Sequence, residues 1–439
     1  MSEFEPSGIT HRHHHRFSGF LRSRSLYWWM YPSRIALCVV LPIYVGCGGF
    51  DAADYALYKQ PYVFLVSDRF WLGFAGLVAF AIGSLCVESQ QSSPKQSEVE
   101  GRDLRVILGW LYAVTLAAYA IFLLPILFKP QLVVELYDGS LSAAYTLRST
   151  LERIPGVTTL STLQSLCVVL HLLHRRITGT ILPGIYTVLL LALVFACLLR
   201  TWLWSERLAL IELAVPAVLV VVGLSAKRRT LLLAASPVLG LLVVFALFGV
   251  GEYFRSWQFY RATWADSFLS FAWVRFVGYY ATALNNGALL YSGSEQGYYP
   301  LHTAVWFYKL PFWEPLGLGF PPPEDIAKRV LAAYGNPEFN NTSGVFQPFL
   351  DFGPVGGVLC WAGLGIASGL LLRSFAGSHL LGLILYPVWY VGILEILRIF
   401  YWGESRFFPV LVVACLVAAY LRYKANHSQR FRAARLLIS

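Results

Sequence analysis

Long apolar blocks alternate with short polar stretches along almost the whole chain. A helix needs about 20 mostly apolar residues to cross the hydrocarbon core of a bilayer. Ten blocks meet or approach this length, and they predict membrane-spanning helices at residues 35–50, 68–87, 106–128, 157–173, 180–199, 208–225, 230–249, 345–372, 379–398 and 405–422. The pattern therefore predicts an all-α polytopic integral membrane protein with about ten transmembrane helices.

The composition supports this fold class. Of the 439 residues, 57% are apolar and 13% are charged, whereas about 25% are charged in an ordinary soluble domain. A soluble fold could not bury so much apolar surface, so we expect the excess to face lipid. The formal net charge is +10, but the charges lie mostly between apolar blocks. This placement favours a role in topology over nucleic-acid binding.

The basic residues predict an orientation, because Lys and Arg in short loops favour the cytoplasmic side. With the N-terminus inside, the inner segments hold 19 of these residues and the short outer loops hold 9. Both termini are then cytoplasmic. The predicted order is a basic tail at 1–34, transmembrane helices 1–7 at 35–249, an outer loop at 250–344, helices 8–10 at 345–422 and a basic tail at 423–439.

The outer loop at 250–344 is long and aromatic. Residues 251–350 contain 25 aromatic side chains, so we expect this region to fold. We predict a helix along the membrane surface at 264–292, an interfacial or re-entrant piece at 302–313 and a short helix at 324–334. Aromatic faces interleaved with amide and acidic side chains suit sugar rings. Belts of aromatic residues at the membrane interface are the alternative interpretation.

Charged residues gather at the predicted outer surface. Glu212 and Glu395 fall inside apolar blocks, where a charge costs about 3 kcal/mol on insertion scales and calls for a partner. Arg398 lies one turn after Glu395 and can pair with it. An arginine at a helix end can also reach lipid headgroups and do nothing else. For Arg200 and Arg207 these two interpretations are evenly balanced.

The arginines at this surface suggest the kind of ligand. A guanidinium group is always charged, and its fork matches phosphate oxygens, so the cluster predicts a site for a lipid-linked phosphate or pyrophosphate. The sequence has no P-loop, no HExxH, no GxSxG and no DxD-like acidic pair in the outer loop. The seven cysteines lie within or at the ends of apolar blocks, without a CxxC motif. We therefore expect neither a metal nor a cofactor.

Four stretches carry a family resemblance. They are RTWLWSER at 200–207, GEYFRS at 251–256, RFVGYY at 275–280 with two asparagines shortly after it, and NTSGVFQPFLDFGPVGG at 341–357 before a glycine-rich helix. In order and placement, over residues 180–420, they resemble the oligosaccharide repeat-unit polymerases, the Wzy-type O-antigen and exopolysaccharide polymerases. The resemblance implies a GT-C-like fold and a membrane glycosyltransferase of the bacterial inner membrane.

The resemblance also implies a mechanism, in which repeat units carried on undecaprenyl pyrophosphate are joined at the periplasmic face without a metal. Arginines would stabilise the pyrophosphate leaving group, and a carboxylate would take the proton of the acceptor hydroxyl. By position, the expected catalytic residues are Arg255, Arg275, Arg398, Arg406 and Glu252. The expected substrate contacts are Arg207, Tyr280, Asn285, Asn286, Asp351 and Glu404, the last two carboxylates being alternative bases. The implied partners are the lipid-linked oligosaccharides, the bilayer, a flippase and a chain-length regulator.

Three other classes fit parts of the pattern. An O-antigen ligase would share the outer arginines and would use a histidine in the long loop, where His302 is the only one. A flippase or transporter of polysaccharide precursors would place charges near the bilayer midplane on broken, symmetry-related helices. Here the charges gather at one face and the sequence shows no repeat. An inactive membrane scaffold would explain the hydrophobicity, but not Glu212 and Glu395.

Overall fold

The computed structural model describes residues 26–60, 62–90, 100–131, 134, 146, 150, 154, 156–204, 206–225, 231–264, 266–293, 299–310, 323–336 and 338–438. For residues 127, 232, 254, 255, 258, 323–326 and 428–438 only the backbone is described. Every regular element in these ranges is helical, which confirms the predicted all-α class.

Six helical segments within the described ranges are long and apolar enough to cross a membrane. They are α4 (Ser67–Glu88), α5 (Gly101–Phe128), the continuous run of α8 (Val157–Leu160), a 3-10 helix (Ser161–Leu163) and α9 (Gln164–Thr178), then α10 (Gly184–Trp204), α18 (Gln347–Ala376) and α20 (Phe408–Ile438). Each coincides with one of the predicted apolar blocks, so these six helices are confirmed.

The other four predicted blocks are also helical, but they are shorter. The first consists of α1 (Pro32–Ile35), a π-helical turn (Ala36–Val40) and α2 (Leu41–Gly48), and the others are α11 (Arg207–Gly223), α13 (Ser236–Glu252) after the short α12 (Leu231–Ala234), and α19 (Leu380–Glu395). Helix α13 continues directly into a π-helical turn at Tyr253–Trp257. Helices α11, α13 and α19 have 17, 17 and 16 residues, below the length of about 20 that a full span needs. The predicted count of ten spans is therefore not confirmed.

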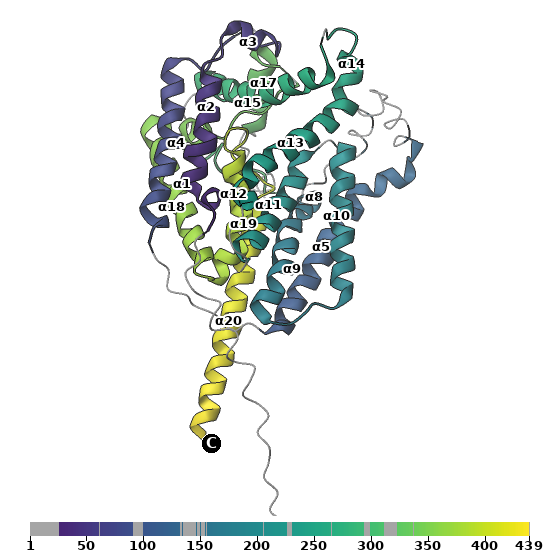
Figure 1. Ribbon diagram of the computed structural model, residues 1–439, viewed down its shortest axis with the longest axis vertical. Coiled ribbons are helices and arrows are strands. Elements are labelled where there is room, and N and C mark those ends of the chain that lie inside the picture. Colours follow the sequence, from purple (N-terminus) through teal and green to yellow (C-terminus); the bar gives the residue numbers. More distant parts are fainter. Residues whose placement is uncertain are drawn as a thin grey trace, which may run out of the picture.

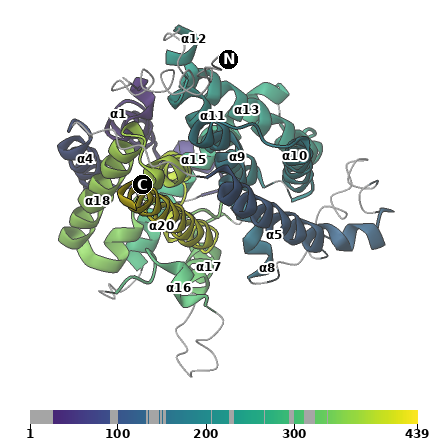
Figure 2. The same ribbon diagram turned by 90° about the horizontal axis from the view of Figure 1, so that it is seen from below.

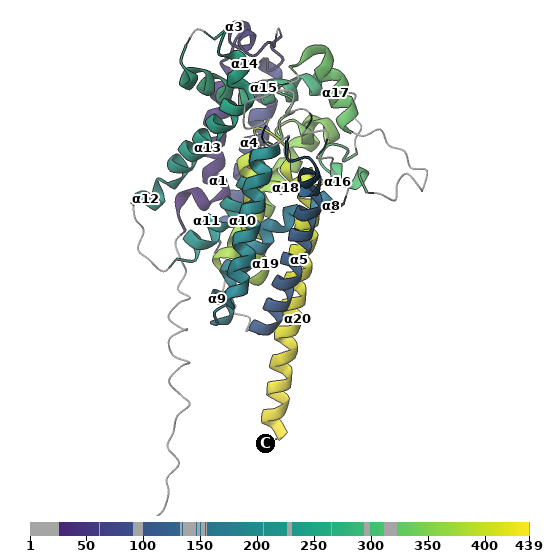
Figure 3. The ribbon, with the colours of Figure 1, turned by 90° about the vertical axis from the view of Figure 1, so that its right-hand side faces the viewer.

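The helices form two groups (Figures 1 and 2). Helices α4 and α18 lie side by side on one flank, and α5, α9 and α10 lie on the other. Helix α19 contacts α18 in the first group and α9 in the second, and it also contacts α11. Helix α20 extends beyond the bundle at one end, as Figure 3 shows, and carries the C-terminus away from the other helices.

The opposite end of the molecule is built by one long helix and several shorter ones from the predicted outer segments. Figure 1 places α3 (Ala52–Ala56), α14 (Gln258–Tyr260), α15 (Phe268–Gly293) and α17 (Pro323–Tyr334) there. Helices α15 and α17 confirm the helices predicted at 264–292 and 324–334. In the predicted piece at 302–313, the described helix is α16 (Val305–Tyr308), and residues 311–313 lie outside the described ranges.

Helices α4 and α18 approach each other closely because glycines line their contact. A Cβ atom added at Gly365 would overlap the carbonyl oxygen of Phe80, and one added at Gly83 would overlap the carbonyl oxygen of Ala362. Small residues allow this approach of two helix backbones within a membrane. Near its start, α18 bends at Gly353, whose φ of 68° is a conformation that favours glycine.

Candidate functional site

A cavity of about 460 Å³ lies where several helix ends meet. Its size falls within the range of about 300–1,000 Å³ that is usual for small-molecule sites. Five cationic and two acidic side chains are among the residues that line it: Phe122, Thr158, Thr159, Thr162, Arg200, Trp204, Glu206, Arg207, Leu208, Tyr279, Lys309, Asn340, Asn341, Arg398, Ile399, Glu404, Ser405 and Arg406.

The four arginines of the cavity come from the ends of four apolar helices. Arg200 lies near the end of α10, and Arg207 is the first residue of α11. Arg398 follows the end of α19, and Arg406 precedes α20. Charged residues are tolerated at such helix ends, where the apolar run stops. Because these ends lie at one level of the bundle, residues far apart in the sequence converge on one cavity.

Two carboxylates hold Arg406 in place. One oxygen of Glu206 lies 2.7 Å from Nη1 of Arg406, and the other lies 2.7 Å from Nη2 of Arg200. Glu212 is 1% exposed and accepts a hydrogen bond from Nη2 of Arg406 at 2.9 Å and another from the Tyr401 hydroxyl at 2.9 Å. The expectation that Glu212 has a partner is therefore confirmed, and that partner is Arg406.

Arg398 forms the ion pair predicted from its spacing to Glu395. Its Nε lies 2.7 Å from Oε2 of Glu395, and the side chains are 13% and 7% exposed. The guanidinium also lies 5.7 Å from the ring centroid of Tyr279, another residue of the cavity wall. Burial and the ion pair together restrict where this guanidinium can point.

A chain of alternating charges leads away from Arg207. Its Nη2 lies 2.7 Å from Glu252, and the second oxygen of Glu252 lies 2.6 Å from Nε of Arg275. Arg275 in turn contacts Glu338 at 2.9 Å, and Glu338 accepts a hydrogen bond from the Tyr260 hydroxyl at 2.7 Å. Although burial opposes it, bonding to Tyr260 and Arg275 lowers the pKa of Glu338 below its usual value.

Three of the carboxylates lie behind the arginines that they bind. Arg207, Arg398 and Arg406 line the cavity, whereas their partners Glu252, Glu395 and Glu212 do not. Glu206, which binds Arg200 and Arg406, does line the cavity, as does Glu404. Five cationic side chains against two carboxylates leave an excess of positive charge, and guanidinium N–H groups suit phosphate oxygens. This arrangement can hold an anion with several phosphate oxygens.

The structure brings together only part of the predicted site. The predicted residues that line the cavity are Arg207, Arg398, Glu404 and Arg406. Glu252 and Arg275 lie behind Arg207 and do not line it. The side chain of Arg255 lies outside the described part of the chain. The predicted sugar contact Tyr280 is half-buried and packs against the hydrophobic core.

Three more predicted residues hold outer segments in place. Nδ2 of Asn285 donates to Oε1 of Gln60 at 3.0 Å, and its Oδ1 accepts from the backbone N–H of Phe64 at 2.6 Å. Nδ2 of Asn286 donates to two backbone carbonyls, and Asp351 accepts the backbone N–H groups of residues 302 and 303. All three are 1% exposed, and none of them lines the cavity. Their bonds fix α15 and the 299–310 segment to the bundle.

The sequence assigns no definite role to five residues of the cavity. For Arg200 the structural and functional interpretations are evenly balanced, and Lys309 is one of several basic residues in the long outer loop. Asn340 and Asn341 stand in an Asn/Thr-rich stretch, and Ser405 belongs to no recognisable motif. All five line the cavity. Their neighbourhood depends on which helix ends converge, and no local pattern encodes that.

His302 lies apart from the arginines. Burial lowers the pKa of its imidazole to about 4, so the ring is neutral at neutral pH. It does not line the cavity. Its backbone N–H donates to Asp351 at 2.8 Å. These features favour a structural position for His302 over the catalytic one that a ligase would need.

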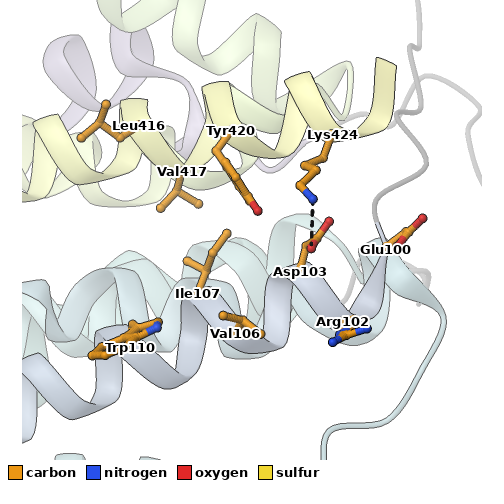
Figure 4. Close-up of a pocket in the computed structure, with 10 residues that line it drawn as sticks. All are labelled: Glu100, Arg102, Asp103, Val106, Ile107, Trp110, Leu416, Val417, Tyr420 and Lys424. Carbon is orange, nitrogen blue, oxygen red and sulfur yellow. Dashed lines mark ion pairs between the residues drawn. The ribbon is translucent and has the colours of Figure 1, made fainter. Parts of the chain in front are cut away.

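A second cavity, of about 690 Å³, lies between α5 and α20 (Figure 4). Its apolar part includes Ile107, Trp110 and Leu416. Two basic and two acidic side chains contribute to it, and Nζ of Lys424 lies 3.9 Å from Asp103. Because these charges balance, this groove is less suited to an anion than the arginine-lined cavity.

No family model matches this chain, and no curated protein or solved structure matches it either. The arginine-lined cavity therefore carries the functional argument.

Proposed function

We propose that this protein is a metal-independent membrane glycosyltransferase that polymerises oligosaccharide repeat units carried on undecaprenyl pyrophosphate, as in O-antigen or exopolysaccharide synthesis. The observation that carries the proposal is the cavity lined by Arg200, Arg207, Arg398, Arg406 and Lys309. Five cations and two carboxylates line this cavity, and the excess of positive charge suits a pyrophosphate group. The hydroxyl and amide side chains of the lining suit the sugars attached to it.

The proposed reaction joins two carrier-linked units. The hydroxyl oxygen at the non-reducing end of the incoming unit attacks the anomeric carbon of the growing chain. A glycosidic C–O bond forms while the C–O bond to undecaprenyl pyrophosphate breaks, and the pyrophosphate leaves with that electron pair. The hydroxyl proton passes to a carboxylate. The cavity arginines stabilise the charge that develops on the leaving group.

Glu404 is the carboxylate best placed to act as the base. It lines the cavity, whereas Glu252 is 1% exposed and lies between two arginines. Asp351 receives several hydrogen bonds from the 299–310 segment. Of the three carboxylates considered from the sequence, Glu404 alone reaches the cavity wall.

The proposal includes ten spans in the bacterial inner membrane, with both termini in the cytoplasm and the 250–344 region in the periplasm. The helices α15 and α17 of that region lie at the end of the molecule opposite the C-terminus (Figure 1), which supports this orientation. The four helices of 16–17 residues complete the count if the bilayer thins around them. A flippase would supply the lipid-linked units, and a chain-length regulator would set polymer length.

The test is replacement of the cavity arginines in cells that make the polymer. We expect Arg398→Ala and Arg406→Ala each to reduce long-chain polymer on a gel by about 10²–10³-fold and to leave single repeat units. Arg175→Ala is the control, because Arg175 is an exposed residue in the last turn of α9 and lies outside the cavity. Normal polymer length in both cavity variants would contradict the proposal.

The same gel distinguishes a polymerase from a ligase. Loss of a polymerase leaves single repeat units, whereas loss of a ligase leaves long polymer on its lipid carrier. Polymer accumulating on the carrier in the deletion strain would favour the ligase function over the one proposed.

A further inference from the structure

Glu252 and Glu212 are the two most buried carboxylates among the partners of the cavity arginines, and Glu252 alone of the two binds Arg207. Glu252 is the last residue of α13 and is 1% exposed. Each of its oxygens contacts a different arginine, Arg207 at 2.7 Å and Arg275 at 2.6 Å. One of these arginines lines the cavity and the other does not. Glu252 thus links a cavity residue to a buried residue of α15.

The surroundings of Arg207 leave its guanidinium little freedom. Its Cζ lies 3.9 Å from the ring centroid of Phe248 and 5.7 Å from that of Tyr279. A Cβ atom at Gly251 would lie 3.3 Å from its Nε, so a larger residue there would press on the guanidinium. Phe248, Gly251 and Glu252 all belong to the end of α13, so the Arg207 guanidinium packs against this helix end.

Arg275 holds Glu252 from the other side. Its Cζ lies 4.9 Å from the ring centroid of Phe339, and its Nη1 contacts Glu338 at 2.9 Å. A buried carboxylate with two fixed partners has a single well-defined position. Groups held this way can position a neighbouring ligand-binding side chain.

We propose that Glu252, held by Arg275, is a positioning residue that aims the guanidinium of Arg207 at a diphosphate group in the cavity. This inference rests on the proposed function, and it replaces the role of general base that the sequence suggested for Glu252. Glu252 acts on the substrate only through Arg207.

Positioning and simple electrostatics predict opposite effects of removing this carboxylate. Glu252→Gln removes a negative charge close to the cavity, so the potential there becomes more positive. If Glu252 contributed only its charge, an anion would then bind more tightly. If it positions Arg207, the anion binds more weakly because the guanidinium is no longer fixed.

The experiment measures binding of inorganic pyrophosphate to the purified full-length protein by isothermal titration calorimetry. We expect Glu252→Gln to weaken binding about tenfold and Glu252→Asp, which keeps the charge on a shorter side chain, to weaken it less. Asp68→Asn is the control, because the Asp68 side chain is 76% exposed and lies outside the cavity. Size-exclusion profiles identify the variants that remain folded. If Glu252→Gln does not fold, the comparison of pyrophosphate binding between Glu252→Asp and the unmodified protein decides the question.

A double-mutant cycle tests whether the effect passes through Arg207. In an Arg207→Ala background, the Glu252 substitutions should cause no further loss of binding. Unchanged or tighter binding by the folded Glu252 variants, or an equal loss in the Arg207→Ala background, would overturn the inference and leave the proposed function standing. If the unmodified protein fails to bind pyrophosphate, the proposed function and this inference fall together.

Discussion

Each arginine of the cavity wall has a carboxylate within 3 Å. The pairs are Arg200 with Glu206, Arg207 with Glu252, Arg398 with Glu395, and Arg406 with both Glu206 and Glu212, the closest atoms lying 2.6–2.7 Å apart. Such partners offset the cost of placing a charge beside lipid and also fix the direction of each guanidinium. In the proposed function, the same contacts serve both insertion into the membrane and recognition of an anion.

Glu404, the proposed general base, allows proton transfer to be tested separately from substrate binding. We expect Glu404→Gln to lower polymer formation by about 10²–10⁴-fold, because the amide cannot accept the acceptor's proton. Pyrophosphate binding should remain, since the arginines are untouched. Polymer yield and calorimetry on the same variant give both quantities, with Asp68→Asn as the control. A variant that still makes normal polymer would show that another group takes the proton.

His302 predicts a pH dependence of stability. Burial lowers the pKa of His302 from 6.5 to about 4, so the unfolded chain binds a proton more readily than the folded one. Stability is therefore lost as the pH falls from 6.5 towards 4, by about 2 kcal/mol at pH 5. In the His302→Gln variant, the melting temperature should depend less on pH across this window. An equally steep pH dependence in that variant would assign the effect to other groups.

At the level of single residues, spacing along the sequence predicted one ion pair. Arg398 lies three residues after Glu395, so helix geometry alone brings the two together. Glu252 and Arg207 are separated by 45 residues, and their contact depends on how α11 and α13 are arranged. For the same reason, Glu252 looked like a candidate base in the sequence and is a buried ion-pair partner in the structure.

Among the helices, the contact between α4 and α18 depends most clearly on small residues. Gly365 and Gly83 each face the backbone of the other helix. Since α18 begins near the outer segments and α4 follows Phe64 and Leu65, which bond to Asn285, this contact also supports α15. Correct placement of the outer region therefore depends on close packing inside the bundle.

Gly365→Ala tests this contact against a matched control on the same helix. The added methyl group would overlap the backbone of α4, and we expect a loss of about 1–3 kcal/mol. Gly363→Ala meets nothing within 4 Å and should be neutral or slightly stabilising, because alanine favours helix. Thermal melting of the two purified variants gives the comparison. Equal melting temperatures would show that the helices can separate at little cost.

The sequence predicted the helices well because each long apolar block is a local signal. It did not predict that the first block would contain a π-helical turn at Ala36–Val40 or that α11, α13 and α19 would stop after 16 or 17 residues. Charged residues mark two of these boundaries: Arg207 begins α11, and Glu252 ends α13, from which the chain continues directly into a π-helical turn at Tyr253–Trp257. Which helix ends meet at the cavity depends on tertiary packing, and no local apolar block encodes it.

For the whole molecule, the main feature is its asymmetry along the bundle. The outer helices lie at one end, and α20 carries the C-terminus from the other (Figures 1 and 3). The positive-inside pattern predicts a cytoplasmic C-terminus. A C-terminal green fluorescent protein should therefore fluoresce, and a C-terminal alkaline phosphatase should be inactive. The reverse result would place the arginine-lined cavity on the wrong side for periplasmic polymerisation.

The most direct test uses the purified protein in proteoliposomes. Undecaprenyl-pyrophosphate-linked repeat units, extracted from cells that lack the protein, are added as the substrate. We predict chains of increasing length, with one undecaprenyl pyrophosphate released for each linkage formed, and no product with Arg398→Ala or Arg406→Ala. Failure of the unmodified protein to lengthen the chains, or equal product from the two arginine variants, would contradict a polymerase site in this cavity.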